Sequence, residues 1–376
     1  MKASRIASAM LGYNRPRLVA SIVGVGVAFF LVQAQFGLLV GWIHTCTALV
    51  RHADVDLWVM ARQTPAFDYG TAIPRQRIYQ ARSVPGVAWT EGMFVAWNVW
   101  QRGDGRHVNV QLVGLDRSGV GGPWEMAAGV VNAVHRPQTV IVDHLYRKAL
   151  GVVGIGEDFE LVGQRARVGG LSRGVRTLSA CPFVFTSLAQ AIRYDRRYRD
   201  DQITYVIVRC KPGADVGAVQ REMSGRIPGA EVLTTAEFVG RSARYWMLET
   251  GIGITVIVTA VLGLAVGTVI LSQTLFAITQ DNLAHYSMLL AVGFSGRTLV
   301  MMILGQALVL GVSGMLLGIA LLLPAAWLSA QTPIPLETTP GIFMTLCGVS
   351  LLTCLAASIF SVRRLGMVDP VSVFHG

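Results

Sequence analysis

The sequence is poor in charged residues and especially poor in lysine. Charged residues make up 14% of the 376 residues, against roughly 25% in ordinary soluble domains, while hydrophobic residues make up 52%. The only lysines are Lys2, Lys148 and Lys211, and none of them follows a glycine. The G-x-x-x-x-G-K-[ST] loop that holds ATP phosphates is therefore excluded. The composition indicates a membrane protein without ATP-hydrolysing machinery of its own.

Cysteine and histidine are few and scattered. The five cysteines show no C-x-x-C spacing, and the seven histidines show no H-E-x-x-H pattern or closely spaced pair. Zinc sites and thioredoxin-like chemistry are therefore not expected, and no metal ligand is assigned. Cys181 and Cys210 fall in the same long segment between apolar runs and form a candidate disulfide. Cys347 and Cys354 lie within an apolar run and are expected to be packing residues.

One stretch matches a catalytic signature. Residues 170–174 read G-L-S-R-G, which fits the nucleophile elbow of α/β-hydrolases, where an acid and then a histidine follow the serine along the chain. Every histidine of the surrounding segment precedes Ser172, and the next one, His285, lies beyond the following apolar run. We expect a glycine-rich hairpin at this place and assign no catalytic residue to the chain.

Four long runs are almost free of charge. They cover residues 18–42, 251–278, 298–330 and 341–362, and each exceeds the roughly 20 residues that cross a hydrocarbon core about 30 Å thick. The first run is too long for a signal peptide, and no A-x-A site closes it. The expected fold is therefore a membrane α-helical protein with four transmembrane helices and a large α+β domain, residues 43–250, inserted between helices 1 and 2.

The charges near the runs predict their orientation. Four basic residues precede the first run and two arginines follow the fourth, so the positive-inside rule places both termini in the cytoplasm. Residues 1–17 are then a cytoplasmic interfacial helix, and residues 279–297 and 363–376 are a cytoplasmic loop and tail. The 43–250 domain and the short 331–340 loop face the periplasm.

The net charge of +10 does not indicate nucleic-acid binding. The large domain has a mild excess of basic residues and no dense basic run, whereas nucleic-acid partners require a clustered positive patch. We expect no nucleic-acid partner.

The large domain alternates strand and helix patterns. Strands are predicted at 54–60, 86–101, 107–116 and 139–143, a hairpin at 157–162 and 166–171, and a strand, helix and strand unit over 204–235 with its helix at 215–227. From residue 236 the pattern becomes helical and runs directly into the second apolar run. That continuity predicts a rigid helical stalk.

Small and polar residues punctuate the apolar runs. Gly263 with Gly267, and Gly314 with Gly318, each fit G-x-x-x-G, a spacing that lets helix backbones approach closely. Gln273 and Gln306 are expected to form interhelical hydrogen bonds more readily than to contact a substrate, because an unsatisfied amide is costly in hydrocarbon. No apolar run contains an acidic residue, which argues against an ion-driven pump.

The loop between the second and third runs is the most informative short segment. It opens at Asp281 with a helix N-cap candidate and ends at Gly293, which brackets about three turns of helix. Its apolar residues exceed what a short loop in water needs. A docking partner is therefore expected for this helix.

This loop carries a family resemblance. Residues 285–295, H-Y-S-M-L-L-A-V-G-F-S, are similar to the E-Y-A-x-L-x-A-x-G-x-S coupling helix of FtsX/MacB-type permeases. Five further stretches resemble the DevC branch of that superfamily, so the likeness covers nearly the whole chain: 54–59, 74–80, 84–87, 211–215 and 368–374. His285 replaces the family's usual glutamate, and Asp281 could partly substitute for the missing carboxylate.

The resemblance implies a homodimeric permease of the bacterial inner membrane that binds a separate ABC ATPase, which uses ATP and Mg. The loop residues implied to couple with the ATPase are Asp281, Asn282, Leu283, His285, Tyr286, Met288, Leu289, Gly293 and Phe294. The large domain would meet a periplasmic adaptor protein, which connects to a TolC-like outer-membrane duct.

The implied function is non-catalytic mechanotransmission that exports an amphiphile such as a glycolipid. Two alternatives stay open: a permease that extracts lipids or lipoproteins without a duct, and an FtsX-like transmitter that signals to a cell-wall hydrolase. The size of the 43–250 domain argues against the second alternative.

Overall fold

The computed structural model describes residues 15–116, 120–177, 181–281 and 283–365, and these divide into two compact units. The sheet unit comprises Trp42–Gly253 and Gln331–Ile334. The helix unit comprises residues 15–41, Ile254–Ala330 and residues 335–365. Most of the predicted interfacial helix at 1–17 and of the predicted tail at 363–376 lies outside the described residues.

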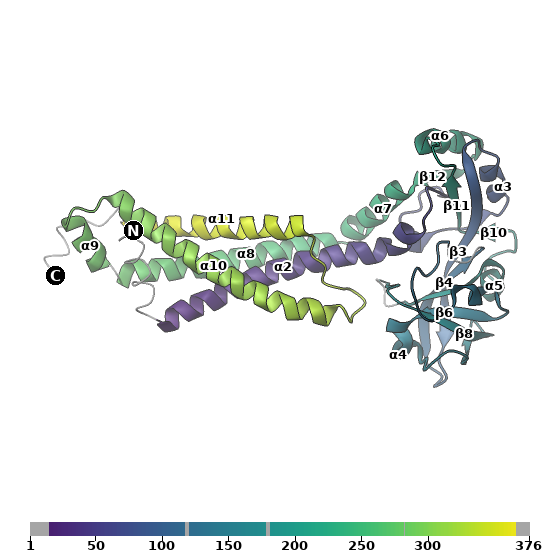
Figure 1. Cartoon of the computed structure of the whole chain (residues 1–376), viewed down its shortest axis with the longest axis horizontal. Coiled ribbons are helices and arrows are strands. Elements are labelled where there is room, and N and C mark those ends of the chain that lie inside the picture. Colours follow the sequence, from purple (N-terminus) through teal and green to yellow (C-terminus); the bar gives the residue numbers. More distant parts are fainter. Residues whose placement is uncertain (1–14, 117–119, 178–180, 282, 366–376) are drawn as a thin grey trace. The chain divides into compact units, whose positions relative to one another are not determined.

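The sheet unit contains one large mixed sheet and a small two-stranded one (Figure 1). Its strands are β1 (Leu57–Ala61), β2 (Ile73–Pro74), β3 (Val87–Gln101), β4 (His107–Leu115), β5 (Met126–Gly129), β6 (Thr139–Asp143), β7 (Asp158–Leu161), β8 (Gln164–Ser172), β9 (Phe183–Ser187), β10 (Gln202–Ile203), β11 (Tyr205–Cys210) and β12 (Ala230–Thr234). Along the large sheet the order is β12-β1-β11-β3-β4-β9-β6-β8-β5, and β7 pairs with β3 and β8. Most neighbours are antiparallel, but β4 with β9 and β6 with β8 are parallel.

Short helices accompany this sheet. They are α3 (Arg77–Arg82), α4 (Arg147–Leu150), α5 (Leu188–Tyr194), α6 (Val216–Arg226) and α7 (Thr235–Arg244), with 3-10 turns η1 (Phe67–Tyr69), η2 (Val131–His135) and η3 (His144–Tyr146) and the π-helical turn η4 (Tyr245–Glu249). Side-chain caps begin the longer ones: Asp215 accepts the Gly217 N–H ahead of α6, and Thr234 accepts the Glu237 N–H ahead of α7. Such caps satisfy N–H groups that have no partner inside the helix.

The core of the sheet unit lies on both faces of the sheet. In β1, Leu57 and Val59 belong to one buried cluster, whereas Trp58 and Met60 belong to the other. Successive side chains of a strand point to opposite faces, so β1 is covered on both sides. This explains why its sequence reads as a continuous apolar run.

The structure confirms most of the predicted elements of this unit. The predicted strands at 86–101 and 107–116 correspond to β3 and β4, which pair antiparallel. The 157–171 hairpin corresponds to β7 and β8, and α6 lies between β11 and β12 as predicted. Strand β9 was not predicted, although it joins β4 to β6. Its five residues carry no alternating pattern, because they too are buried on both faces.

The helix unit consists of long apolar helices (Figure 1). They are α2 (Arg15–His52), whose residues up to Gly41 belong to this unit, α8 (Ile252–Asp281), α10 (Gly296–Ser329) and α11 (Pro340–Leu365), and the short α9 (Leu283–Ala291) joins α8 to α10. Three segments are long and apolar enough to cross a membrane: Leu18–His52, Ile252–Asp281 and Gly296–Ser329. The apolar part of α11 is shorter, Pro340–Ala356. A fourth crossing stays a prediction.

The predicted continuous stalk is wrong. Helix α7 is followed by the π-helical turn η4, and α8 begins only at Ile252. Between them Gly251 has a φ of +76°, a left-handed conformation that glycine adopts readily and that ends a right-handed helix. The sequence from 236 onward is compatible with helix at every position, so the pattern did not reveal this break.

Candidate functional site

Helix α9 lies where the sequence predicts a coupling helix. Its last turn is closed by a hydrogen bond from the Phe294 N–H to the Leu289 carbonyl oxygen at 3.0 Å. Gly293, between them, has a φ of +98°, which is the left-handed conformation typical of a residue that ends a helix. The predicted role of Gly293 as the end of this helix therefore has a clear backbone reason.

The side chains of α9 divide into a buried and an exposed face. Tyr286 and Ser287 each keep only 1% of their accessible surface, whereas Met288 and Val292 expose 63% and 73%. His285 is exposed as well. We call His285, Met288 and Val292 the exposed face of α9. These residues, of which Val292 was not among the predicted coupling residues, are accessible to a partner.

Tyr286 packs into its own bundle. The side chain of Gln306 in α10, itself 1% exposed, interacts with the Tyr286 hydroxyl, and burial raises the pKa of Tyr286. Tyr286 is therefore not part of the exposed face of α9, and its implied role in coupling to the ATPase stays a prediction. Nearly every residue of this helix is apolar, so the pattern could not distinguish its two faces.

The other predicted coupling residues that the structure describes are neither fully buried nor part of the exposed face of α9. Leu289 and Phe294 are partly buried, and Asp281 is exposed at the end of α8. Asn282 and the side chain of Leu283 lie outside the part of the chain that the structure describes. Their predicted roles stay predictions.

The glycines of α10 lie against α2. A Cβ placed on Gly314 would stand 2.5 Å from Val25 Cγ1, and one on Gly318 would stand 2.5 Å from Phe29 Cδ1 and 2.8 Å from the Gly26 carbonyl oxygen. Such distances are shorter than carbon atoms tolerate. The two helices can therefore approach this closely only because these positions lack side chains.

The glycines of α8 also face α2. A Cβ on Gly267 would stand 2.5 Å from the Ala28 Cβ, whereas one on Gly263 would make ordinary contact with Val32 at 3.8 Å. Both G-x-x-x-G stretches therefore contact α2 of the same chain. Helix α2 is the element around which the described bundle packs.

Polar side chains in the bundle are mostly paired. Ser21 of α2 donates a hydrogen bond to Thr274 of α8 at 3.0 Å, and the Gln33 amide donates to the Phe343 carbonyl oxygen at 3.4 Å. The hydrogen bond of Gln33 was not predicted, although this amide lies within the first apolar run. Only 1% of its surface is exposed. Gln273, which was expected to form an interhelical bond, is instead exposed on α8.

The G-x-S-x-G stretch has a structural role. Ser172 is fully buried at the end of β8 and donates a hydrogen bond to Asp143 Oδ2 at 3.0 Å. The same carboxylate accepts the N–H groups of Leu145 and Val175 at 2.9 Å. The serine and the acid therefore tie β8 to the end of β6. Among the described residues, no group of three or more His, Cys, Asp or Glu could hold a metal ion.

The predicted disulfide between Cys181 and Cys210 is wrong, because neither cysteine forms a disulfide in this structure. Cys210 ends β11 opposite Val87, whereas Cys181 precedes β9, which pairs with β4. Strands β3 and β4 lie between β11 and β9, and three strand spacings of about 4.8 Å separate the two cysteines by about 14 Å or more. A disulfide requires Cα atoms within about 7 Å.

The two chain connections of the sheet unit meet at one pair of strands. Leu57 of β1 lies opposite Thr234 of β12, so the strand that follows α2 pairs with the strand that precedes α7. Thr235 joins them: its hydroxyl donates to the Val55 carbonyl oxygen at 2.6 Å and accepts the Trp58 indole N–H at 3.1 Å. A displacement of either connecting segment would therefore reach the same strand pair.

Further contacts hold the end of α2 within this unit. The His52 ring stacks on Trp124, with ring centroids 4.0 Å apart. The same unit holds an acid with a perturbed pKa: burial raises the pKa of Asp68, in η1, to about 6, against lowering contributions from Gln111 and Trp246. Sequence reasoning did not identify Asp68, since a lone acid among aromatic residues carries no motif.

Two family models cover the chain. Residues 18–226 match the MacB-like periplasmic core domain, and residues 257–370 match the FtsX-like permease C-terminal domain. The first match alone spans more than half of the chain. No curated protein sequence matches the chain closely enough to count as a relative.

The solved structures that are similar to the chain include two domains of transport proteins. The periplasmic region of MacB from Actinobacillus actinomycetemcomitans is 10% identical, with 49% of this chain and 91% of that one covered and a TM-score of 0.39. The extracellular domain of the noncanonic ABC-type transporter YknZ from Gram-positive bacteria is 12% identical, with 48% and 98% covered and a TM-score of 0.35.

The family matches define the class as ABC transporter permeases, which are inner-membrane subunits with a periplasmic domain that work with an ABC ATPase. The chain belongs to the FtsX/MacB-like permease superfamily.

Proposed function

We propose that this chain is the permease of a mechanotransmission exporter of the DevC type. Two copies of the chain bind a separate ATPase through α9, and ATP binding and hydrolysis there drive the sheet unit. The sheet unit acts on a periplasmic adaptor and an outer-membrane duct, and the exported substrate is an amphiphile such as a glycolipid. The chain itself transmits force and performs no catalysis.

The observation that carries this proposal is the exposed face of α9. A short helix between two apolar helices presents Met288 and Val292 with 63% and 73% of their surface accessible, which is unfavourable unless a partner covers them. On its other face, Tyr286 and Ser287 are buried. A force applied to the exposed face would therefore reach α10 through the contact between Tyr286 and Gln306.

The sheet unit supports the second half of the proposal. The connecting segments on either side of it, α2 and α7, meet at the β1 and β12 pair through Thr235. Relative movement of the two segments would act first on that strand pair. A unit that receives force at one strand pair and carries a rigid two-faced sheet is suited to moving an attached partner.

The test is affinity purification of the full-length tagged chain from mild detergent, followed by mass spectrometry and an ATPase assay. Wild-type protein should recover a P-loop ATPase and an adaptor. Val292→Asp should abolish ATPase recovery, because it places a charge in an apolar contact. Val153→Asp is the matched control, since Val153 is exposed to a similar degree, 75%, but lies in the sheet unit. It should leave ATPase recovery unchanged.

The outcomes separate the competing functions. Recovery of an ATPase without an adaptor would favour a permease that extracts lipids or lipoproteins without a duct. Recovery of a cell-wall hydrolase in place of an adaptor would favour an FtsX-like transmitter. A wild-type chain that purifies without any ATPase would overturn the proposal as a whole.

A further inference from the structure

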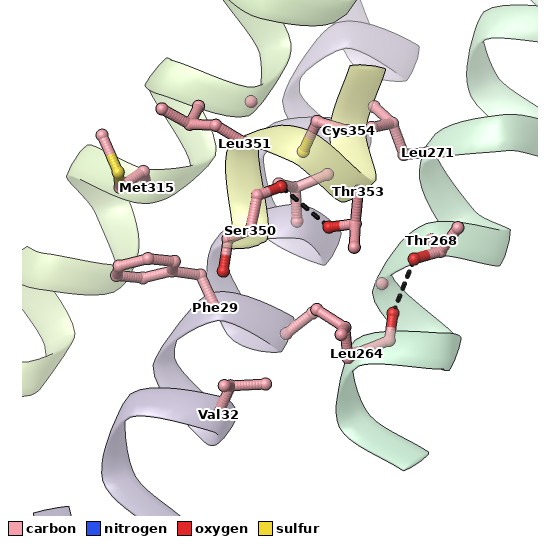
Figure 2. Close-up of a pocket in the computed structure, with 14 residues that line it drawn as sticks. Phe29, Val32, Leu264, Thr268, Leu271, Met315, Ser350, Leu351, Thr353 and Cys354 are labelled. Carbon is pink, nitrogen blue, oxygen red and sulfur yellow. Dashed lines mark hydrogen bonds between the residues drawn. The ribbon is translucent and has the colours of Figure 1, made fainter. Parts of the chain in front are cut away.

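The cavity at the centre of the helix unit is a small gap in the packing. Figure 2 shows it among α2, α8, α10 and α11, with side chains such as Phe29, Met315 and Leu351 around it. Its volume of about 30 Å³ has room for about one water molecule or methylene group. The Thr268 and Thr353 hydroxyls beside it donate to carbonyl oxygens of their own helices, both at 2.8 Å. Unpaired buried polar atoms point instead to a place in the sheet unit.

The carboxyl group of Asp68 lies where the two connecting segments of the sheet unit come together. Asp68 belongs to η1, and both Cys46 of α2 and Trp246 of η4 interact with it. Helix α2 leads into the sheet unit, and η4 leads out of it towards α8. The Tyr69 ring, next along the chain, contacts the rings of Tyr245 and Trp246 at centroid distances of 5.4 and 6.2 Å. One acidic side chain thus lies between the entry and the exit of the unit.

The sheet holds the backbone of η1 in place. Trp97 of β3 donates its indole N–H to the Asp68 carbonyl oxygen at 2.9 Å. Tyr205 of β11 donates its hydroxyl to the Phe67 carbonyl oxygen at 2.7 Å, and the two rings stack with centroids 5.5 Å apart. A change at the Asp68 carboxyl should therefore displace the elements packed against η1 and not η1 itself.

Two buried polar atoms beside this carboxyl have no hydrogen-bond partner in the part of the chain that the structure describes. They are Nε1 of Trp246 and Oε1 of Gln111 in β4, and these residues are 9% and 0% exposed. The indole N–H needs an acceptor, and the amide oxygen needs a donor. A protonated Asp68 offers both, whereas its carboxylate offers acceptors alone. Only the protonated acid can therefore satisfy both atoms.

Of the titratable groups around this site, only Asp68 changes charge between pH 5 and pH 7.5. Burial raises its pKa to about 6. Cys46, Tyr69 and Tyr205 interact with it electrostatically, but cysteine and tyrosine ordinarily titrate at about 8.5 and about 10, and burial raises the pKa of both tyrosines further. Arg51 of α2, which acts on Cys46, stays charged throughout this range.

We propose that Asp68 is a pH-sensitive switch that holds η4 on the sheet when it is protonated. The neutral acid donates to Gln111 Oε1 and accepts the Trp246 N–H, which closes the contact. Loss of the proton leaves a charge among aromatic rings, and water must enter to solvate it. The entry of water loosens η4 just ahead of Gly251. The inference concerns the sheet unit alone, so it does not depend on the ATPase, the adaptor or the exported substrate.

Hydrogen exchange of the full-length protein in detergent, followed by mass spectrometry, tests the switch. Wild type and Asp68→Asn are compared at the same pH, which cancels the pH dependence of the intrinsic exchange rate. Asparagine keeps a donor and an acceptor in the place of the neutral acid. The amides of η4 should exchange faster in the wild type, and the ratio of the two rates should rise about tenfold between pH 5 and pH 7.5. A ratio that does not change with pH would overturn the proposal.

Two controls separate the switch from a general gain in stability. The amides of α6, in the same unit, should give a ratio that does not depend on pH. An equal rise in α6 would show that Asp68 affects the unit as a whole and would count against the switch. Asp201→Asn is the matched variant, because the Asp201 side chain is 65% exposed. It should leave the exchange of η4 unchanged at both pH values.

A second measurement needs no Asp68 variant, in case Asp68→Asn prevents folding. The wild-type protein is labelled with 5-fluorotryptophan, and Trp246→Phe identifies the fluorine resonance of Trp246. That resonance should shift with a midpoint near pH 6, whereas the resonance of Trp100, which is 0% exposed and contacts Phe159, should not. A Trp246 resonance that stays constant from pH 5 to pH 7.5 would show that the carboxyl does not act on η4.

Discussion

The sheet unit and the helix unit bury different kinds of residue. In the sheet unit the largest buried side chains are aromatic, such as Trp58, Trp100 and Tyr205, all at 0% exposure. In the helix unit close contacts between helices are made at Gly267, Gly314 and Gly318, while Trp327 remains 70% exposed.

The difference follows from the two solvents. In water, removing a large apolar surface stabilises a fold in proportion to the area buried. In lipid, an exposed apolar side chain costs nothing, so helices gain from close backbone packing and from satisfied polar groups. The same residue type should therefore have opposite importance in the two units.

The largest expected effect tests this with two tryptophans. Trp58→Ala should destabilise the sheet unit by about 3–5 kcal/mol, because it leaves a cavity among Phe67, Tyr205 and Phe238. Trp327→Ala should change stability little. Urea unfolding of the full chain in detergent, followed by near-ultraviolet circular dichroism, would measure both. Equal losses would show that the comparison is mistaken.

A half-buried acid of the sheet unit, Asp68, makes stability depend on pH. Since burial raises the pKa of Asp68 from its usual 3.8 to about 6, the folded state holds this proton to higher pH than the unfolded state does. The contribution of Asp68 to the free energy of unfolding should therefore be largest below about pH 4. It should fall by at most about 3 kcal/mol as the pH rises through 6.

Asp68→Asn should remove that fall. The stability gained by Asp68→Asn over the wild type should grow between pH 4 and pH 7.5, measured by the urea midpoint. Asp104 is a control of opposite sign, because hydrogen bonding from the Arg106 N–H, opposed by partial desolvation, lowers its pKa. A gain from Asp68→Asn that is the same at every pH would contradict the assignment.

A third comparison lies within one helix of the helix unit. Gly314→Ala should cost about 1–3 kcal/mol, because its Cβ would stand 2.5 Å from Val25 Cγ1. Gly305→Ala on the same helix should be neutral or stabilising, because none of the described side chains or distant backbone atoms lies within 4 Å of its Cβ. Thermal unfolding in detergent would separate them, and similar losses would show that α2 does not pack on α10.

The smallest expected effect compares two helix caps. Thr234→Ala should destabilise by about 1 kcal/mol, because Thr234 accepts the Glu237 N–H at 3.2 Å and its own N–H donates to the Glu237 carboxylate at 2.8 Å. Ser295→Ala, at the start of α10, should cost less, because its bond to the Thr298 N–H is longer, 3.4 Å. Urea and thermal midpoints of both variants would check the order.

The sequence by itself determined the elements that depend on local chemistry. The apolar runs predicted the long helices, the strand patterns at 86–101 and 107–116 predicted β3 and β4, and the position of Gly293 predicted the end of α9. The loop motif also identified the family, because it combines that helix end with apolar residues at fixed spacing. Each of these properties is set by residues that are neighbours along the chain.

Only the tertiary structure decided the properties that depend on distant residues. The sequence of α9 does not separate its two faces, and only the packing of the helix unit leaves Tyr286 1% exposed and Met288 63% exposed. The strand order of the sheet separates Cys181 from Cys210, although the sequence allowed them to pair. The left-handed Gly251 breaks a stretch that is helical by pattern, since a single backbone angle leaves no periodic trace in the sequence.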